Sequence, residues 1–394
     1  MSDVTVRPLR DEELPSAWEL GRVTFGGPAD PPPVAVQPVA GWQRLGAFDS
    51  RGRLVGKATD LGHEQWWGGR RVPTADVGGV AVAPEARGAG VARLLLSTLL
   101  ERAREKGAAV SALYPTVSAV YRRLGWEVVG ALQRAELDTA SLPSAPVPGV
   151  SVRPGEPADL AVVDALYETL ARPRTGLLTR RGGAFALPHG GRWPDGVDGV
   201  TVAEQDGVPT GVLVYERGAG YGPEARLTVH DLLGVTAEAA RALVGVLAGW
   251  RTVTRTVRVP LLAGDAVSAV LPLERSSEGP GAAFMHRPVD VVRAVADRGW
   301  PGHVRGRVAF TLLDPVVTEN TGPWELELAD GAGELRRPDR EPGLTLDVRG
   351  FAQLYCGTTT GRAAALAGLV SGPEDPSALD LLASGPPAQL LDYF

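Results

Sequence analysis

One stretch, VGGVAVAPEARGAGVARLLLSTLLERAREKG at residues 77–107, constrains the fold more than any other part of the chain. An apolar run typical of a buried strand stops at Pro84, and a basic, glycine-containing turn follows it. Apolar residues at helical spacing come next: Val91, Leu95, Leu99 and Ala103. The pattern predicts a strand, a turn and an amphipathic helix that starts near Gly90 and is capped by Gly107.

The turn itself predicts a site for an anion. Glycines leave backbone N–H groups unobstructed, and the start of a helix adds positive potential. Together with Arg87, these groups suit a pyrophosphate. The turn is neither a Walker A loop nor a Gly-x-Gly-x-x-Gly dinucleotide fingerprint. The alternative interpretation is a tight strand-to-helix turn with incidental glycines.

Composition excludes several classes of protein. The 394 residues predict two or three domains, and a net charge of −6 argues against a nucleic-acid-coating role. The single cysteine, Cys356, cannot form an intramolecular disulfide, which favours a cytoplasmic location. Without a cysteine pair, and with only five histidines, a structural zinc site is not expected. We also expect no signal peptide and no membrane span.

Two Pro-, Ser- or Gly-rich stretches predict domain boundaries: SLPSAPVPGV at residues 141–150 and, more weakly, LERSSEGPGAAFMHR at residues 273–287. We therefore expect three domains, at residues 1–145, 150–280 and 285–394. The first mixes strands and helices and ends with WEVVGALQRAELD as a final strand. The second opens with VSVRPGEPADLAVVDALYETLA, a strand and helix like those that open the first, and reads as a degenerate copy. The third has strand signals, LTLDVRGFAQLY among them, before the helical TGRAAALAGLV.

The pattern Arg87-x-x-Gly90-x-Ala92, with a strand before it and VYRRLGW after it, resembles the acetyl-CoA-binding motif of the GCN5-related N-acetyltransferases (GNAT). The order of the three units is similar to that of the enhanced intracellular survival (Eis) family. This resemblance implies an α+β fold with tandem GNAT domains of mixed sheets and flanking helices. It also implies a second domain without a cofactor site, a C-terminal sterol-carrier-protein-like domain and a homohexamer.

The resemblance assigns roles to particular residues. The acetyl-CoA-binding positions would be Val80, Ala81, Val82, Arg87, Gly88, Ala89, Gly90, Val91, Ala92, Arg93, Thr116 and Val117. Tyr121 falls where the family has its general acid, and the carboxyl group of Phe394 where it has its general base. A phenol, with a pKa of ~10, is protonated at neutral pH and can donate to a thiolate whose conjugate acid is near ~8.5. Otherwise Tyr121 would be a half-buried aromatic that anchors a short helix.

The proposed base is a poorer chemical match. An α-carboxyl pKa of ~3.5 is far below the ~10.4 of an alkylammonium. Either burial raises the carboxyl pKa, or water relays the proton, or the carboxylate mainly orients the amine. The apolar end LLDYF predicts a docked tail rather than a solvated one. Asp392 and Tyr393 would contact the substrate or lie on the surface, and Phe25 would line the acceptor pocket or belong to the core.

The sequence therefore predicts an acetyl-CoA-dependent N-acetyltransferase that acts on primary amines of a cationic, aminoglycoside-, polyamine- or lysine-like acceptor. Acetyl-CoA is the cosubstrate, and neither a metal, nor nucleic acid, nor a membrane is expected as a partner. One alternative is a lipid- or acyl-CoA-binding protein whose CoA site is regulatory. Another is a natural-product acyltransferase. The intact turn together with Tyr121 favours the enzyme.

Overall fold

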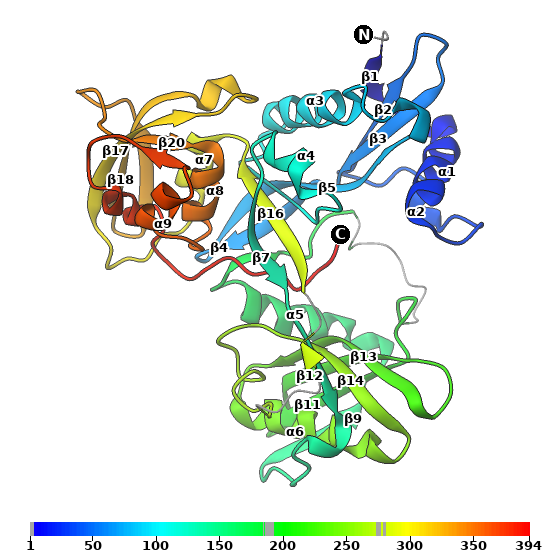
Figure 1. Cartoon of the computed structure of the whole chain (residues 1–394). Coiled ribbons are helices and arrows are strands. Elements are labelled where there is room, and N and C mark those ends of the chain that lie inside the picture. Colours follow the sequence, from blue (N-terminus) through cyan, green and yellow to red (C-terminus); the bar gives the residue numbers. More distant parts are fainter. Residues whose placement is uncertain (1–3, 184, 186–192, 273–276, 279–280) are drawn as a thin grey trace.

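The computed structural model describes residues 4–183, 185, 193–272, 277–278 and 281–394. Three β-sheets with flanking helices confirm the predicted α+β class. In Figure 1 they form three lobes that meet along two long central strands, β7 (Glu127–Leu132) and β16 (Ala282–Pro288). Among the described ranges, no helix combines the length and the apolar character that a bilayer crossing requires.

The first sheet has the order β1-β2-β3-β5-β6-β16-β7, with β4 paired to β5 and β10 paired to β4. Its further strands are β1 (Thr5–Pro8), β2 (Gln43–Phe48), β3 (Leu54–Asp60), β4 (His63–Trp67), β5 (Arg70–Val82), β6 (Val110–Leu113) and β10 (Thr175–Leu178). The parallel strands β5 and β6 are joined by α3 (Val91–Glu105). This is the strand, turn and helix expected from residues 77–107.

Helices cover both faces of this sheet. On one face, α3 packs so closely that a Cβ atom on Gly56 of β3 would lie 2.9 Å from Leu95. The next side chain of β3, Lys57, points to the opposite face because side chains alternate along a strand. There its Nζ atom lies 2.7 Å from the Cβ position of Gly21 in α1 (Leu14–Phe25). The two faces of β3 therefore contact different helices. The short α2 (Pro33–Val36) follows α1.

The second sheet has the order β15-β8-β14-β13-β12-β11-β9. Its strands are β8 (Arg134–Asp138), β9 (Val150–Pro154), β11 (Gly199–Gln205), β12 (Val208–Arg217), β13 (Gly222–Gly234), β14 (Thr254–Pro260) and β15 (Ser277–Glu278). The parallel pair β13 and β14 is joined by α6 (Ala237–Ala248), which repeats the arrangement of β5, α3 and β6. α5 (Leu160–Ala171) follows β9, as the expected second copy requires.

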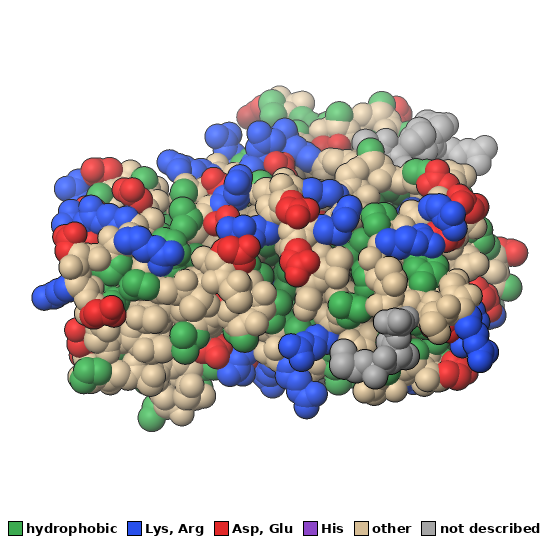
Figure 2. All heavy atoms as spheres, turned by 90° about the horizontal axis from the view of Figure 1, so that it is seen from above, with side chains coloured by type: hydrophobic (Ala, Val, Ile, Leu, Met, Phe, Trp, Pro, Cys, Tyr) green, Lys and Arg blue, Asp and Glu red, His purple; other side chains and the backbone are tan. Residues whose placement is uncertain are grey.

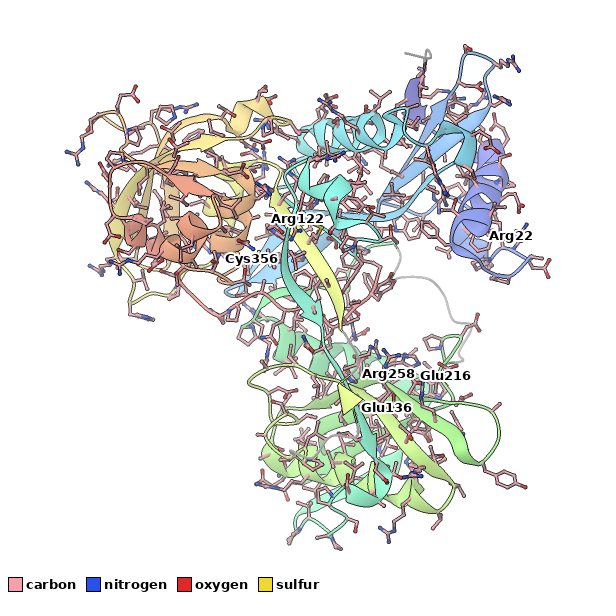
Figure 3. All side chains as sticks on the ribbon, viewed as in Figure 1. Arg22, Arg122, Glu136, Glu216, Arg258 and Cys356 are labelled. Carbon is pink, nitrogen blue, oxygen red and sulfur yellow. The ribbon has the colours of Figure 1, made fainter. Side chains whose placement is uncertain are left out.

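Strands are exchanged between the two sheets. WEVVGALQRAELD, expected as one strand, is two: β7 in the first sheet and β8 in the second, on either side of Gln133. β8 pairs with β14, and Figure 3 shows Glu136 and Arg258 side by side on these strands. β16 returns to the first sheet between β6 and β7. The expected boundary at residues 273–287 thus contains β15 and most of β16, while residues 273–276 and 279–280 lie outside the described residues.

The third sheet has the order β19-β18-β17-β20-β21. Its elements are β17 (Gly306–Leu313), β18 (Gly322–Ala329), β19 (Ala332–Arg336), β20 (Thr345–Asp347), β21 (Val370–Ser371), α7 (Val291–Asp297), α8 (Val348–Tyr355) and α9 (Gly361–Leu366). The expected strand LTLDVRGFAQLY is mostly helix α8. Asp347 caps this helix, because its side chain accepts a hydrogen bond of 2.8 Å from the backbone N–H of Arg349.

Candidate active site

The strands β5 and β6 separate at the C-terminal end of their pairing. They pair from Thr74 with Val110 to Val77 with Leu113, whereas β5 continues to Val82. A bulge interrupts the pairing of β5 with β3 just beyond Gly78, and Gly79 within it has a φ of +60°. The bulge bends β5, as extra residues in one strand do. Val80, Ala81 and Val82, the predicted backbone partners of acetyl-CoA, lie in this separated part of β5.

The turn before α3 is open, as its glycines predict. Gly88 and Gly90 have φ values of +78° and +82°, which favour glycine, and no atom lies within 4 Å of the Cβ position of either. Gly90 is the residue before α3, so the predicted helix start is confirmed. Val91, Ala92 and Arg93 form the first turn of α3, and the Val91 side chain is buried. The Arg87 side chain folds back, with its Nε atom donating to the Val82 carbonyl at 3.4 Å.

Three of the predicted site residues follow β6. Val117, next to Thr116, precedes the short helix α4 (Ser118–Arg122) and keeps 56% of its surface exposed. Tyr121 in α4 is 7% exposed, and its ring meets Trp126 edge-on at 6.2 Å between centroids. Burial raises the pKa of Tyr121, so the phenol is protonated at neutral pH. Figure 3 shows Arg122 of the same helix beside the central strands.

The C-terminal segment docks against the first sheet, as its apolar residues predict. Leu390 and Leu391 are buried, and the backbone N–H of Gln389 donates to the Thr175 carbonyl of β10. The carboxyl carbon of Phe394 lies 3.8 Å from the Cβ position of Gly78, at the start of the bulge. The structure thus brings a residue 316 positions away from Gly78 to the point where β5 and β6 separate.

Asp392 holds this segment in place. Its carboxylate accepts a hydrogen bond of 2.9 Å from Nε of Arg180, and its carbonyl accepts one of 2.7 Å from the Tyr114 hydroxyl. Arg180 also forms two bonds of 2.8 Å to Asp231 and lies over the ring of Tyr167. Burial lowers the Arg180 pKa, but Asp231 and Asp392 together hold it well above its ordinary value. Asp392 therefore anchors the tail, a role that the sequence did not indicate.

Two further expectations concern exposed aromatic residues. Tyr393 is 67% exposed, and its ring lies 4.5 Å from that of Tyr114. Phe25, at the end of α1, is 51% exposed and does not belong to the core. The core expectation for Phe25 is wrong because the helix ends there and turns this residue to solvent.

Three charged or titratable residues near the bulge were not singled out by the sequence. His63 of β4 and Asp76 of β5 form a buried hydrogen bond of 3.0 Å. The Nζ atom of Lys57 in β3 lies 3.7 Å from the position that a Cβ atom on Gly79 would occupy, and no described carboxylate pairs with Lys57. Burial, with repulsion from Arg44, lowers the Lys57 pKa. The bulge region therefore has the ammonium group of Lys57 near Gly79 and the carboxyl group of Phe394 near Gly78.

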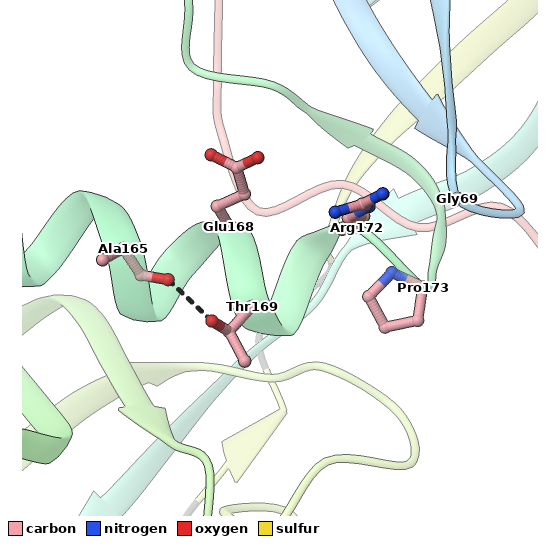
Figure 4. A pocket seen from close by; sticks show the side chains of 6 residues that line it. All are labelled: Gly69, Ala165, Glu168, Thr169, Arg172 and Pro173. Atoms are coloured by element: carbon pink, nitrogen blue, oxygen red, sulfur yellow. Dashed lines mark hydrogen bonds between the residues drawn. The ribbon is translucent and has the colours of Figure 1, made fainter.

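Two hollows lie elsewhere on the described surface. One of about 610 Å³ is bounded by α5 and the β4–β5 turn; its lining is Gly69, Ala165, Glu168, Thr169, Arg172 and Pro173, shown in Figure 4. Another, of about 530 Å³, adjoins residues 143–148 and α6. Neither contains a predicted site residue. The described residues also include no group of three metal-ligating side chains. On the face in Figure 2, Lys and Arg side chains alternate with Asp and Glu, so the described residues there form no continuous basic surface.

The arrangement of β5, the turn and α3 matches known proteins. Acetyltransferase (GNAT) domain models match residues 5–129 and 177–293, and a sterol carrier protein domain model matches residues 291–390. A solved GCN5-related N-acetyltransferase from Kribbella flavida is 32% identical, with 100% of this chain and 99% of that chain covered and a TM-score of 0.86. The chain belongs to the GCN5-related N-acetyltransferases. It is therefore an acetyltransferase, and the GNAT fold implies that acetyl-CoA is its donor.

Other relatives agree with this family. An uncharacterised N-acetyltransferase of Streptomyces griseus is 27% identical over 387 residues, which cover 90% of this chain and 89% of the relative. The structure of Eis1 from Mycobacterium abscessus has the same fold, with 22% identity, 99% of this chain and 100% of that chain covered, and a TM-score of 0.76. The fold of two GNAT domains followed by a sterol-carrier domain is thus shared along the whole chain.

Proposed function

We propose that this GNAT protein transfers the acetyl group of acetyl-CoA to primary amines of a cationic acceptor, and that it belongs to the Eis family. One observation carries the proposal: the carboxyl group of Phe394 lies beside Gly78, where the separated part of β5 begins. This point adjoins the strand that would bind the cosubstrate, so the carboxylate would face the acyl group. An ammonium group is the acceptor that a carboxylate attracts.

The donor site would comprise three segments. The open Cβ positions of Gly88 and Gly90 leave room for a pyrophosphate against the N-terminus of α3. The backbone of residues 80–82 would pair with the pantetheine, and Thr116 and Val117 would line the acetyl end. In the second GNAT domain, the segment between β13 and α6, which corresponds to the turn before α3, carries no Arg-x-x-Gly-x-Gly/Ala sequence. We therefore assign it to a wall of the substrate cleft.

The chain supplies an acid and a carboxylate for the reaction. The Tyr121 hydroxyl would protonate the departing thiolate, and its raised pKa keeps the proton available at neutral pH. The Phe394 carboxylate would orient the amine and draw its proton away. Asp392 fixes that carboxylate through Arg180 and Tyr114. By resemblance to the Eis family we also propose a homohexamer, and from the single cysteine a cytoplasmic location.

Acetyl-CoA binding tests the donor site. Gly90→Glu places a bulky anion where the phosphates would bind, so affinity for acetyl-CoA should fall by more than ~10-fold in calorimetry. Gly52→Glu is the matched control, because Gly52 also has a positive φ of +73° and open space at its Cβ position but lies in the β2–β3 turn. Equal affinities in the two variants would contradict the donor site.

Release of CoA tests the reaction and the acceptor. The wild-type protein should release CoA with di- and polyamines, aminoglycosides or lysine peptides, and a C-terminal extension that removes the free Phe394 carboxylate should suppress this release. An N-terminal extension is the control. If a fatty acid stabilised the protein against heat and acetyl-CoA did not, the result would instead support a lipid-binding function.

A further inference from the structure

A buried histidine and aspartate lie beside the docked C-terminal residue. The hairpin β4–β5 places His63 opposite Thr74, two residues before Asp76. Nδ1 of His63 is 3.0 Å from Oδ2 of Asp76, His63 is 7% exposed and Asp76 has no exposed surface. When Asp76 is ionised, its carboxylate only accepts hydrogen bonds, so Nδ1 of His63 carries the ring proton and Nε2 is the basic nitrogen.

The imidazole contacts the residue that carries the proposed base. The rings of His63 and Phe394 meet edge-on, with centroids 5.8 Å apart and planes at 81°. The carboxyl carbon of Phe394 lies 3.8 Å from the Cβ position of Gly78, which is two residues beyond Asp76 on β5. The imidazole and the terminal carboxylate therefore share one end of the first sheet, where β5 leaves β6.

Anionic groups surround this imidazole on several elements. Asp76 faces it from β5, and Asp60 of β3 interacts with it electrostatically. The Phe394 carboxylate belongs to the residue whose ring contacts the imidazole. Asp392, which interacts electrostatically with Asp76, lies two residues earlier in the tail. These carboxyl groups attract positive charge to the ring. Burial raises the pKa of Asp76, and the hydrogen bond with His63, more than the one with the Ala112 backbone, opposes this rise, so His63 is the main group that stabilises the Asp76 carboxylate.

The proposed reaction needs a proton acceptor of this kind. An alkylammonium has a pKa of ~10.4 and an α-carboxylic acid one of ~3.5, so a carboxylate holds the ammonium but takes its proton poorly. An imidazolium has a pKa of ~6.5, so its pKa is about three units closer to that of the alkylammonium than the pKa of the carboxylic acid is. The terminal carboxylate and the imidazole together thus cover orientation and deprotonation.

Building on the proposed function, we propose that His63 accepts the proton that the acceptor amine loses, with Asp76 stabilising the resulting imidazolium. The N–H bond of the ammonium breaks, and its proton passes to Nε2 of His63, directly or along the Phe394 carboxylate. The freed lone pair forms the C–N bond, the C–S bond breaks, and the thiolate takes the Tyr121 proton. The second N–H proton that the new amide must lose passes to the tyrosinate, and the imidazolium releases its proton to water, so both side chains return to their starting states.

Acceptor amines of different pKa distinguish the proton-accepting role of His63 from a structural role. His63→Gln should lower kcat/KM at pH 7 by ~100-fold for an alkylamine of pKa ~10, and the loss should shrink as the pH rises. For an amine of pKa below ~6, which arrives unprotonated, the loss should stay within ~3-fold. His303→Gln is the matched control, since His303 is exposed and lies between α7 and β17, outside the first sheet.

Asp76→Asn keeps an oxygen for the Nδ1 proton but removes the charge, so it tests the pair even if the His63 variant fails to fold. It should lose ~10-fold with the alkylamine and much less with the weakly basic amine. Equal losses for the two amines, or no loss at any pH, would overturn the role of His63. Acetyl transfer by the wild-type protein shows separately that the proposed function holds, and its absence with every amine would overturn both proposals.

Discussion

A carboxyl group buried in the first sheet gives a stability prediction that can be worked out in detail. Asp60, at the end of β3, is 3% exposed, and its Oδ1 atom accepts a hydrogen bond of 2.8 Å from the backbone N–H of Gly62. Burial raises the pKa of Asp60 from 3.8 to about 6. Because a tenfold change in proton affinity equals about 1.4 kcal/mol, the ionised form costs the folded state roughly 3 kcal/mol.

The sign follows from proton binding. The folded protein holds the Asp60 proton more tightly than the unfolded chain does. The protonated carboxyl group therefore contributes stability that is fully present below about pH 4 and is lost as the pH rises through about 6. Asp60→Asn keeps an acceptor for Gly62 without the charge. It should raise the free energy of unfolding by up to about 3 kcal/mol at pH 8 and by about 1.5 kcal/mol at pH 5.

Urea denaturation at the two pH values measures this difference. Asp49→Asn is the control with the opposite sign, because the backbone N–H and side chain of Arg53 lower the pKa of Asp49. That variant should be less stable than wild type at pH 8. A variant of Asp60 that is no more stable than wild type at pH 8, or whose gain does not shrink at pH 5, would refute the reasoning.

Three other substitutions test the site. Tyr121→Phe should lower turnover by ~100-fold without changing acetyl-CoA affinity in calorimetry, and turnover within ~2-fold of wild type would exclude the acid role. Asp392→Asn removes a charged hydrogen bond to Arg180 worth about 1.5–3 kcal/mol, so amide exchange in residues 388–394 should accelerate by ~10-fold or more; unchanged exchange would mean that other contacts anchor the tail. Lys57→Gln removes an ammonium group beside the bulge that would repel the second charge of a diamine. The kcat/KM for a diamine should therefore improve relative to that for a monoamine, and an unchanged ratio would place Lys57 outside the acceptor site.

Local signals in the sequence were sufficient for the strand, turn and helix of the donor site. Gly90 and the apolar spacing after it act within a few residues, and α3 begins at Val91 as expected. The mixed α+β class followed from the same kind of evidence. The start of α8 could also have been read, because Asp347 is a favourable residue at the N-terminus of a helix.

Pairing across the sheets could not be read locally. Apolar alternation identifies a strand but not its neighbour, so the division of residues 127–138 between two sheets was missed. The His63–Asp76 pair had a usable signal: Gly68-Gly69 is a two-residue hairpin turn between HEQWW and RRVPTADV, and counting back from it pairs His63 with Thr74. The anchoring of Asp392 by Arg180 joins residues 212 positions apart and left no local signal.

The exchange of strands also sets an order for synthesis. β6 and β7 are complete by residue 132, but β16, which fills the space between them, is not made until residue 288. Until then both strands have an open edge, and closing the sheet requires a loop of about 150 residues, which slows folding. A recombinant fragment that stops near residue 145 would keep those edges exposed and also carry β8 without its partner β14. Such a fragment should aggregate, although it contains the whole acetyl-CoA motif.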